Sequence, residues 1–230
     1  MDLEVDGEMF ELILESKLNS IQDDLLIYSE ETVERINDSV NGFINNDVSV
    51  SRSIIESTDE INRKSYKIEH ECLKILGLHQ PLAKDLRLGA AVLRVSIELE
   101  RINDLSAYIS RYAIDSNENA LNYHKPPHII FMSETVQKML QDGVGALLNE
   151  DLQLLKRCTK NYVVVQDFYN QMFEEYNDVT NSSSHTYLIL VGRNLLSMGN
   201  HVMGMADRVA YSIVGKRVMH HKLFHNVLMR

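Results

Sequence analysis

The sequence has no tryptophan and only three prolines in 230 residues, two of them adjacent at Pro126 and Pro127. Glycine is also thinly spread, with 10 residues. Proline and glycine disfavour helix interiors, so their scarcity in stretches rich in Leu, Ile, Glu, Lys and Met favours helices over strands. Apolar residues make up 44% of the chain. That fraction is enough for an ordinary core, so we exclude a wholly disordered protein.

Cysteines and long apolar runs are scarce as well. The two cysteines, Cys72 and Cys158, lie among apolar residues within helical patterns. We expect buried free thiols, as in a reducing compartment. No uninterrupted apolar run reaches the length of about 18 residues that a membrane span needs, and the acidic start does not resemble a signal peptide. The sequence therefore predicts a soluble, cytoplasmic protein without membrane insertion.

Positive charge is in deficit, since the formal net charge is −10. A nucleic-acid-binding face needs clustered Lys and Arg to neutralise phosphates, so we expect no nucleic-acid partner. Basic residues gather only in the tail from Lys216 to Arg230, which also contains histidines. A solvated tail is the simpler interpretation, and contact with an anionic membrane surface is the alternative.

Apolar residues recur every three or four positions along six segments, which predicts six amphipathic helices. The predicted helices cover residues 7–45, 48–76, 81–114, 129–148, 151–176 and 186–214. We expect Asp47 to cap the second helix, Gly77 to end it, and Pro81 to lie in the first turn of the third. The polar stretch 115–125, ahead of Pro126, favours a domain boundary between residues 121 and 122.

The two halves of the sequence repeat one another. In the first two helices of each half the offset is 104, as for Val40 and Val144. In the third helix of each half the offset is 96, and seven apolar or small positions of residues 92–113 match seven of residues 188–209. Such steps of three and four are typical of near-antiparallel helix packing. The predicted fold class is all-α, with two tandem three-helix bundles related by internal duplication: residues 1–121, and residues 122–230 with the basic tail.

Four segments resemble the PhoU family. The stretch LHQPLAKDLR (78–87) resembles the family's Q-P-V-A-S-D-L-R entry to the third helix, and ELERIND (98–104) its D-L-E-R-I-G-D signature. In the second half, VQDFYNQMF (165–173) resembles the V-D-x-L-Y-x-x-L-F pattern, and Arg193, Asn194, Leu195 and His201 fall where the family has R-N-L-E-R-I-A-D-H. The resemblance covers nearly the whole chain, and it implies the PhoU-like fold.

Glu100 and Asp104 form the candidate site. They are four residues apart, so their carboxylates lie on one helical face, one turn apart. Such a pair is half of a site for a hard or borderline cation. The resemblance implies E-x-x-x-D pairs, two per bundle, that hold iron or other divalent metals. We expect at most a weak divalent or iron site, in the first bundle only, with Glu98 and Asn62 assisting.

Three of the four implied acidic pairs are missing. The matching positions are Thr58 and Asn62, Tyr162 and Gln166, and Leu196 and Asn200. Neutral side chains contribute far less to divalent affinity, so we predict no metal in the second bundle. The alternative for the first bundle is an ordinary solvated face, in which Arg94 and Arg101 pair with the acids. We expect His201 to be satisfied between helices rather than to bind a metal.

No Gly-rich phosphate loop, Ser-His-Asp set or Cys-His pair is present, so we predict that the protein is not an enzyme. The resemblance implies a cytosolic regulatory adaptor that restrains high-affinity phosphate uptake and acts on phosphate-responsive signalling. The expected partners are subunits of a phosphate ABC transporter and a sensor kinase. Amphipathic three-helix units with methionine-rich outer faces also predict a homodimer.

The sequence allows two alternative functions. One is an accessory subunit of a different phosphate permease, which the sequence does not distinguish from the first. The other is a ferritin-like metal-binding protein, which needs Glu-x-x-His pairs on two helices. The predicted helices contain no such pair.

Overall fold

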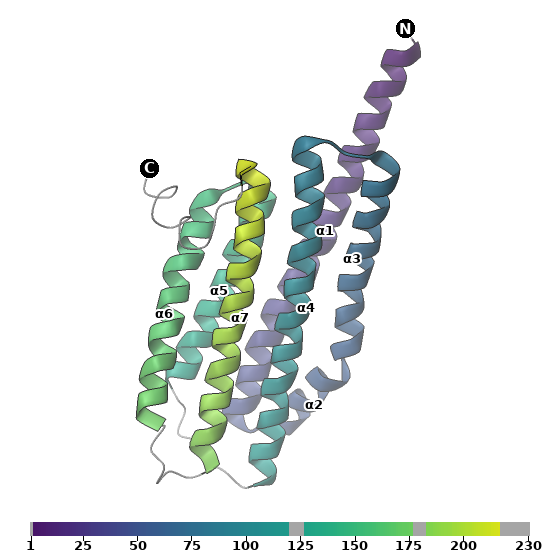
Figure 1. Cartoon of the computed structure of the whole chain (residues 1–230). Helices are drawn as coiled ribbons and strands as arrows, with labels where there is room; N and C mark the ends of the chain where they lie inside the picture. The colour runs from purple at the N-terminus through teal and green to yellow at the C-terminus, as the bar shows by residue number, and fades with distance from the viewer. Residues whose placement is uncertain (1, 120–126, 177–182, 217–230) are drawn as a thin grey trace.

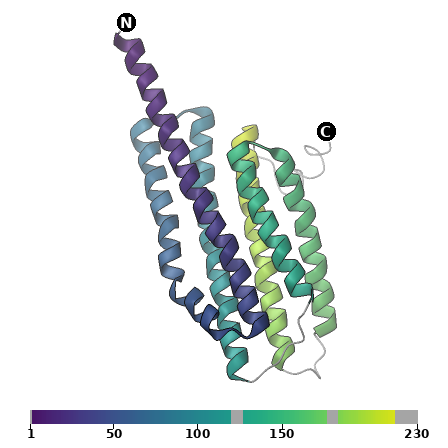
Figure 2. The ribbon, with the colours of Figure 1, turned by 180° about the vertical axis from the view of Figure 1, so that it is seen from behind.

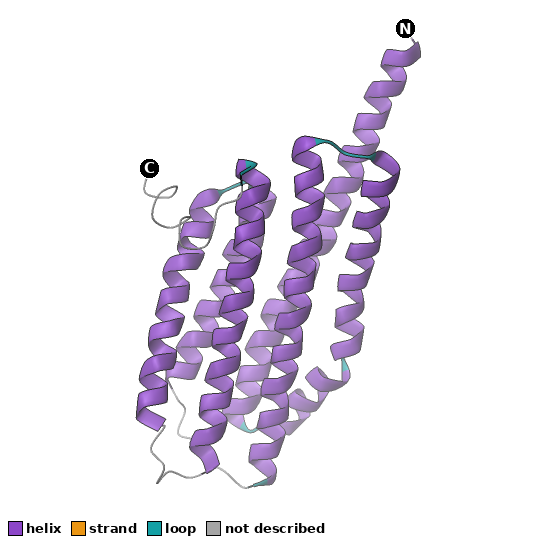
Figure 3. Cartoon of the chain, viewed as in Figure 1, coloured by secondary structure: helices purple, strands orange, loops and turns teal. Residues whose placement is uncertain are grey.

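The structure is a computed structural model, and it describes residues 2–119, 127–176 and 183–216. Every regular element within these ranges is a helix (Figure 3). The helices are α1 (Asp2–Asn45), α2 (Val48–Glu56), α3 (Thr58–His79), α4 (Ala83–Glu118), α5 (Pro127–Asn149), α6 (Leu152–Tyr176) and α7 (Ser183–Val214). The all-α prediction is confirmed. The predicted domain boundary and the tail beyond Lys216 lie outside the described residues.

The helices form two groups side by side, α1 to α4 and α5 to α7 (Figures 1 and 2). The groups meet chiefly where α4 and α7 run antiparallel along one another, and α1 also packs on α5. The beginning of α1 extends past the ends of the other helices (Figure 1). None of the described helices is long and apolar enough to cross a membrane.

The core is one continuous cluster that runs through both groups. Its centre is formed by the two repeated seams predicted from the sequence. All seven seam positions of α4 are at most 1% exposed, and all seven of α7 are at most 4% exposed. The helical periodicity therefore identified the buried faces of α4 and α7 correctly. Because both seams contribute to one core, the two halves stabilise one another.

The predicted second helix, residues 48–76, is two helices in the structure, broken at Ser57. At the break, the Ile54 carbonyl accepts hydrogen bonds from Thr58 Oγ1 and from Arg35 Nη2, each at 2.8 Å. These side chains occupy the acceptor that would otherwise continue the backbone ladder. In the second half the residue that matches Arg35 is Met139, and α6 is unbroken there. An interaction from another helix thus divides this segment.

The predicted ends of the next helices also differ from the structure. Gly77 does not end α3, which continues to His79, and Gln80 takes the left-handed conformation with φ of 45°. Pro81 lies before α4, which begins at Ala83, and not in its first turn. The residue before a proline is disfavoured in the helical conformation, so Pro81 and not Gly77 decides where α3 stops.

Two other helix ends carry well-defined caps. Asp47 caps α2 as predicted, because its carboxylate accepts a hydrogen bond from the Val50 N–H at 3.1 Å. Gly215 follows α7 with φ of 73°, and its N–H donates to the Tyr211 carbonyl at 2.9 Å. A glycine in this conformation ends a helix and turns the chain away from the helix axis.

Candidate functional site

The structure brings Asp104 on α4 close to Asn62 on α3. Asn62 Nδ2 donates a hydrogen bond to Asp104 Oδ1 at 2.9 Å. Glu100, one turn earlier on α4, is half-buried. Asp104 Oδ2 also lies 3.9 Å from Arg101 Nη1. This long ion pair agrees with the alternative of an ordinary solvated face, in which Arg101 pairs with the acids. Asn62 therefore lies where the sequence predicted it, and the Asp104 carboxylate is shared between an amide and a guanidinium.

A half-buried arginine, Arg35, contacts one member of this site. Arg35 Nη2 donates to Thr58 Oγ1 at 3.0 Å. Thr58 belongs to what we call the first-half set, the four positions of the first half at which the resemblance implies acidic pairs: Thr58, Asn62, Glu100 and Asp104. Burial lowers the pKa of Arg35. The nearby Tyr28 hydroxyl has a raised pKa, chiefly because it is buried, with smaller contributions from Glu100 and Asp104. The Thr58 hydroxyl therefore already accepts a hydrogen bond from a cationic side chain, which disfavours Thr58 as a ligand of a metal cation.

The matching positions of the second half form a neutral, hydrogen-bonded cluster. Tyr162 on α6 donates to Asn200 Oδ1 on α7, and Gln166 Nε2 donates to the Tyr162 hydroxyl at 3.2 Å. Burial raises the pKa of Tyr162, so its hydroxyl stays neutral. The Tyr162 ring lies over Gly199, where a Cβ atom would come within 3.3 Å of the ring. The fourth position is Leu196, so this set contains no carboxylate.

These donor sets do not fit the metal site that the resemblance implies. Within the described ranges, no three or more His, Cys, Asp or Glu side chains are grouped so that they could hold a metal ion. The second-half set offers only neutral oxygens. The first-half set offers two carboxylates and one amide, and its Thr58 hydroxyl is engaged by the Arg35 guanidinium. Hard divalent cations prefer more charged oxygen ligands than either set provides.

Glu98 takes a role that the sequence analysis assigned wrongly. Its carboxylate is buried at 4% exposure, and Oε2 lies 2.7 Å from His201 Nδ1 on α7. Oε1 lies 2.7 Å from Arg94 Nη2. Gly204 makes room for this group, since a Cβ atom there would be 3.3 Å from Oε1. Glu98 therefore faces α7 and does not assist Asp104, whereas the prediction that His201 is satisfied between helices is confirmed.

A buried polar cluster between α1 and α4 was not predicted from the sequence. Asn103 Nδ2 donates to the Tyr28 hydroxyl at 3.2 Å and to Thr32 Oγ1 at 3.1 Å. All three residues are fully buried. The signal available was Thr32, the one polar residue that interrupts the apolar face of the first helix. The matching residues of the second half are apolar or lack a side chain: Met132, Val136 and Gly199.

A family model for the PhoU domain matches the chain twice, at residues 25–113 and 129–209. The two matches begin 104 residues apart and end 96 residues apart, which are the two offsets of the internal repeat. Together they cover well over half of the sequence. The chain belongs to the PhoU family.

Individual PhoU relatives agree with this assignment. The phosphate-specific transport system accessory protein PhoU homolog 2 of Methanothermobacter thermautotrophicus is 56% identical over 95% of this chain and 97% of its own length. The crystal structure of PhoU from Pseudomonas aeruginosa is similar with a TM-score of 0.81 at 28% identity, covering 88% of this chain and 99% of that one. PhoU from Streptococcus pneumoniae, a phosphate transport system regulatory protein, has the same TM-score at 18% identity, which supports the fold alone.

Proposed function

We propose that this chain is an accessory regulator of phosphate transport, which restrains high-affinity phosphate uptake and phosphate-responsive signalling. The observation that carries this proposal is the 56% identity, over nearly the full length of both proteins, to a phosphate-specific transport system accessory protein. The similarity to a PhoU crystal structure at 28% identity supports it.

In this proposal the chain acts by contacting other proteins in the cytoplasm and not by catalysis. The beginning of α1 supports the idea, because it exposes apolar side chains that an isolated soluble helix would not need. Met9 is 56% exposed and Leu12 is 66% exposed. The proposed partners are subunits of a phosphate ABC transporter, a sensor kinase and a second copy of the chain.

Regulation in this proposal does not require a tightly bound metal. A divalent or iron ion at Glu100 and Asp104, with Asn62 as a third donor, would bind weakly. With so few charged ligands we expect dissociation constants of about 0.1 mM or weaker for Mg²⁺ and Mn²⁺ in calorimetric titration. The variant Glu100→Gln with Asp104→Asn should abolish that heat. Binding a hundredfold tighter, or binding that survives the double substitution, would contradict this arrangement.

Deletion and affinity purification together test the regulatory function. Cells that lack the gene should take up labelled phosphate faster than the parent when phosphate is plentiful, and the intact gene should restore the lower rate. The tagged protein purified from such cells should bring with it the ATP-binding subunit of a phosphate transporter. Unchanged uptake would contradict the proposal. Recovery of a different phosphate permease in place of the ABC transporter would support the alternative accessory role.

A further inference from the structure

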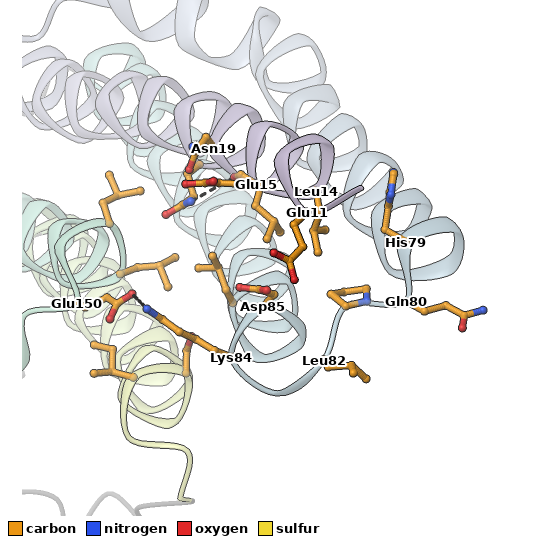
Figure 4. Close-up of a pocket in the computed structure, with 18 of the residues that line it drawn as sticks. Glu11, Leu14, Glu15, Asn19, His79, Gln80, Leu82, Lys84, Asp85 and Glu150 are labelled. Atoms are coloured by element: carbon orange, nitrogen blue, oxygen red, sulfur yellow. Dashed lines mark hydrogen bonds and ion pairs between the residues drawn. The ribbon is translucent and has the colours of Figure 1, made fainter. Parts of the chain in front are cut away.

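A cleft of about 750 Å³ opens at the end of the molecule where α3 passes into α4 (Figure 4). Its walls come from the N-terminal part of α1, the first turns of α4, the connection between α5 and α6, and the end of α7. Both halves of the chain therefore contribute to it.

The cleft has an apolar floor and an acidic rim. Leu14, Leu18 and Leu147 are buried at its base. Its lining also includes four carboxylates: Glu11, Glu15, Asp85 and Glu150. Figure 4 shows the Glu11 and Asp85 carboxylates facing the same opening.

Only one of these carboxylates has a cationic partner in the described part of the chain. Lys84 Nζ lies 2.6 Å from Glu150 Oε1, and both side chains are about half exposed. No ion pair joins Glu11, Glu15 or Asp85 to another described residue. Like charges that share one opening repel one another, so a cationic occupant would be stabilised there.

The chain leaves its last helix at the edge of this cleft. Ser212 and Ile213 line the cleft, and Arg87 Nε on α4 donates to the Ser212 carbonyl at 3.2 Å. The left-handed Gly215 then turns the chain away from the α7 axis. The Arg87 guanidinium carbon lies 3.4 Å from where a Cβ atom of Gly215 would be. Gly215 and Lys216, the last described residues, therefore lie beside the first turns of α4.

The 14 residues that follow, 217–230, have the opposite chemistry to the rim. They contain Arg217, Lys222, Arg230 and three histidines, and neither Asp nor Glu. Apolar residues recur among them at steps of one, three and four: Val218, Met219, Leu223, Phe224, Val227, Leu228 and Met229. An extended chain spans about 3.3 Å per residue, so this length reaches roughly 46 Å and is ample for the cleft.

We propose that the C-terminal segment 217–230 docks into this cleft of its own chain, with its apolar residues on the leucine floor and its cations against Glu11, Glu15 and Asp85. Attachment at Lys216 keeps the segment near the cleft at an effective concentration on the order of millimolar, so even weak contacts hold it. A partner that takes the same cleft must displace the segment first.

A single introduced tryptophan can report this docking, because the sequence has none. In the full-length chain carrying Phe224→Trp, we expect blue-shifted emission and weak quenching by acrylamide. NaCl at about 1 M should shift emission to the red and strengthen quenching, because salt screens exposed charges. Adding Glu11→Gln, Glu15→Gln and Asp85→Asn should lower the ratio of docked to free segment by about tenfold, since each exposed pair contributes a factor of roughly two.

A matched control neutralises three exposed carboxylates outside the cleft lining: Glu60→Gln, Glu134→Gln and Asp167→Asn. It makes the same charge change and should leave the emission as it was. Circular dichroism checks that each variant is folded. If the variant with the neutralised cleft is not folded, the salt titration of the Phe224→Trp chain decides between docking and no docking. Three results would overturn docking in the same chain: full quenching at low salt, protection that grows with protein concentration, or protection only with phosphatidylglycerol vesicles. The second result would indicate docking to another copy, and the third a membrane surface.

Discussion

At the scale of single residues, the first half of the chain carries polar groups in its core that the second half lacks. Asn103 Nδ2 donates to both Tyr28 and Thr32 across α1 and α4, while Asn103 Oδ1 has no hydrogen-bond partner within the described residues. A buried polar group without a partner is costly, so these residues depend on one another. Their replacement by Met132, Val136 and Gly199 in the second half shows that the fold itself does not require them.

Replacing Asn103 with alanine should lower the free energy of unfolding by roughly 1–3 kcal/mol, because the buried Tyr28 hydroxyl loses the donor that bonds to it. Urea denaturation measures the change, and Asn170→Ala on the exposed face of α6 is the control. In the background of Tyr28→Phe the same substitution should cost less. An equal loss in both backgrounds would show that the two side chains are not coupled.

Because its two cysteines are buried, we expect the protein to lose stability at alkaline pH. Burial raises the pKa of both Cys72 and Cys158 to about 12. An unfolded thiol has a pKa of about 8.5, so above that pH the unfolded chain loses protons that the native chain keeps. Stability contributed by the buried thiols is complete below about pH 8.5 and falls as the pH rises towards 12.

The free energy of unfolding should therefore decrease from pH 8 to pH 10.5. A variant with Cys72→Ala and Cys158→Ala should decrease less steeply, whatever its stability at pH 8. Parallel curves for the two proteins would contradict the assignment. Slow alkylation of both thiols in the native protein at pH 8 is an independent check, because the thiolate is the reactive form.

At the scale of helices, the most informative element is the divided pair α2 and α3. Arg35 on α1 donates to Ser57 Oγ at 2.8 Å as well as to Ile54 and Thr58. It thereby satisfies polar groups at the end of α2 that have no partner in the backbone ladder. One side chain stabilises the break by bonding both sides of it.

Arg35→Met, which introduces the residue found at the matching position 139, should destabilise the chain by roughly 1–3 kcal/mol. Hydrogen exchange should become faster over residues 48–58 and stay unchanged over α6. Arg63→Met, at an exposed position of α3, is the control for loss of a positive charge. Unchanged exchange at the break would mean that Arg35 does not stabilise it.

The helices and their buried faces could be predicted because local periodicity specifies them. The seam from Val92 to Ala113 and its copy in α7 are examples. The break at Ser57 could not, since it depends on Arg35 from another helix. The sequence could have shown which way Glu98 points, because residues two positions apart on a helix point about 200° away from one another. Glu98 and Glu100 therefore face different neighbours. The pairing of Glu98 with His201 could not be predicted from the sequence, because it depends on how α7 packs against α4.

At the scale of the whole molecule, α4 and α7 join the two halves, and the buried Glu98 meets the half-buried His201 where these helices pack together. His201→Ala should lower the free energy of unfolding by roughly 1–3 kcal/mol, because Glu98 stays buried with Arg94 as its one remaining ionic partner. His201→Gln, which can still donate a hydrogen bond, should cost less. Equal losses for the two variants in thermal unfolding would show that the histidine acts through packing alone.

This contact also makes the two repeats unlike at the surface where they meet. In the repeat, Asn194 occupies the position that matches Glu98, and Leu105 occupies the position that matches His201. Were the first halves of two chains to associate through their α4 faces, each Glu98 would lie buried against a leucine, without a cation from the other chain. Two first halves therefore lack, at this contact, the charge complementarity that a first and a second half have. Any exchange of halves between two molecules must match a first half with a second.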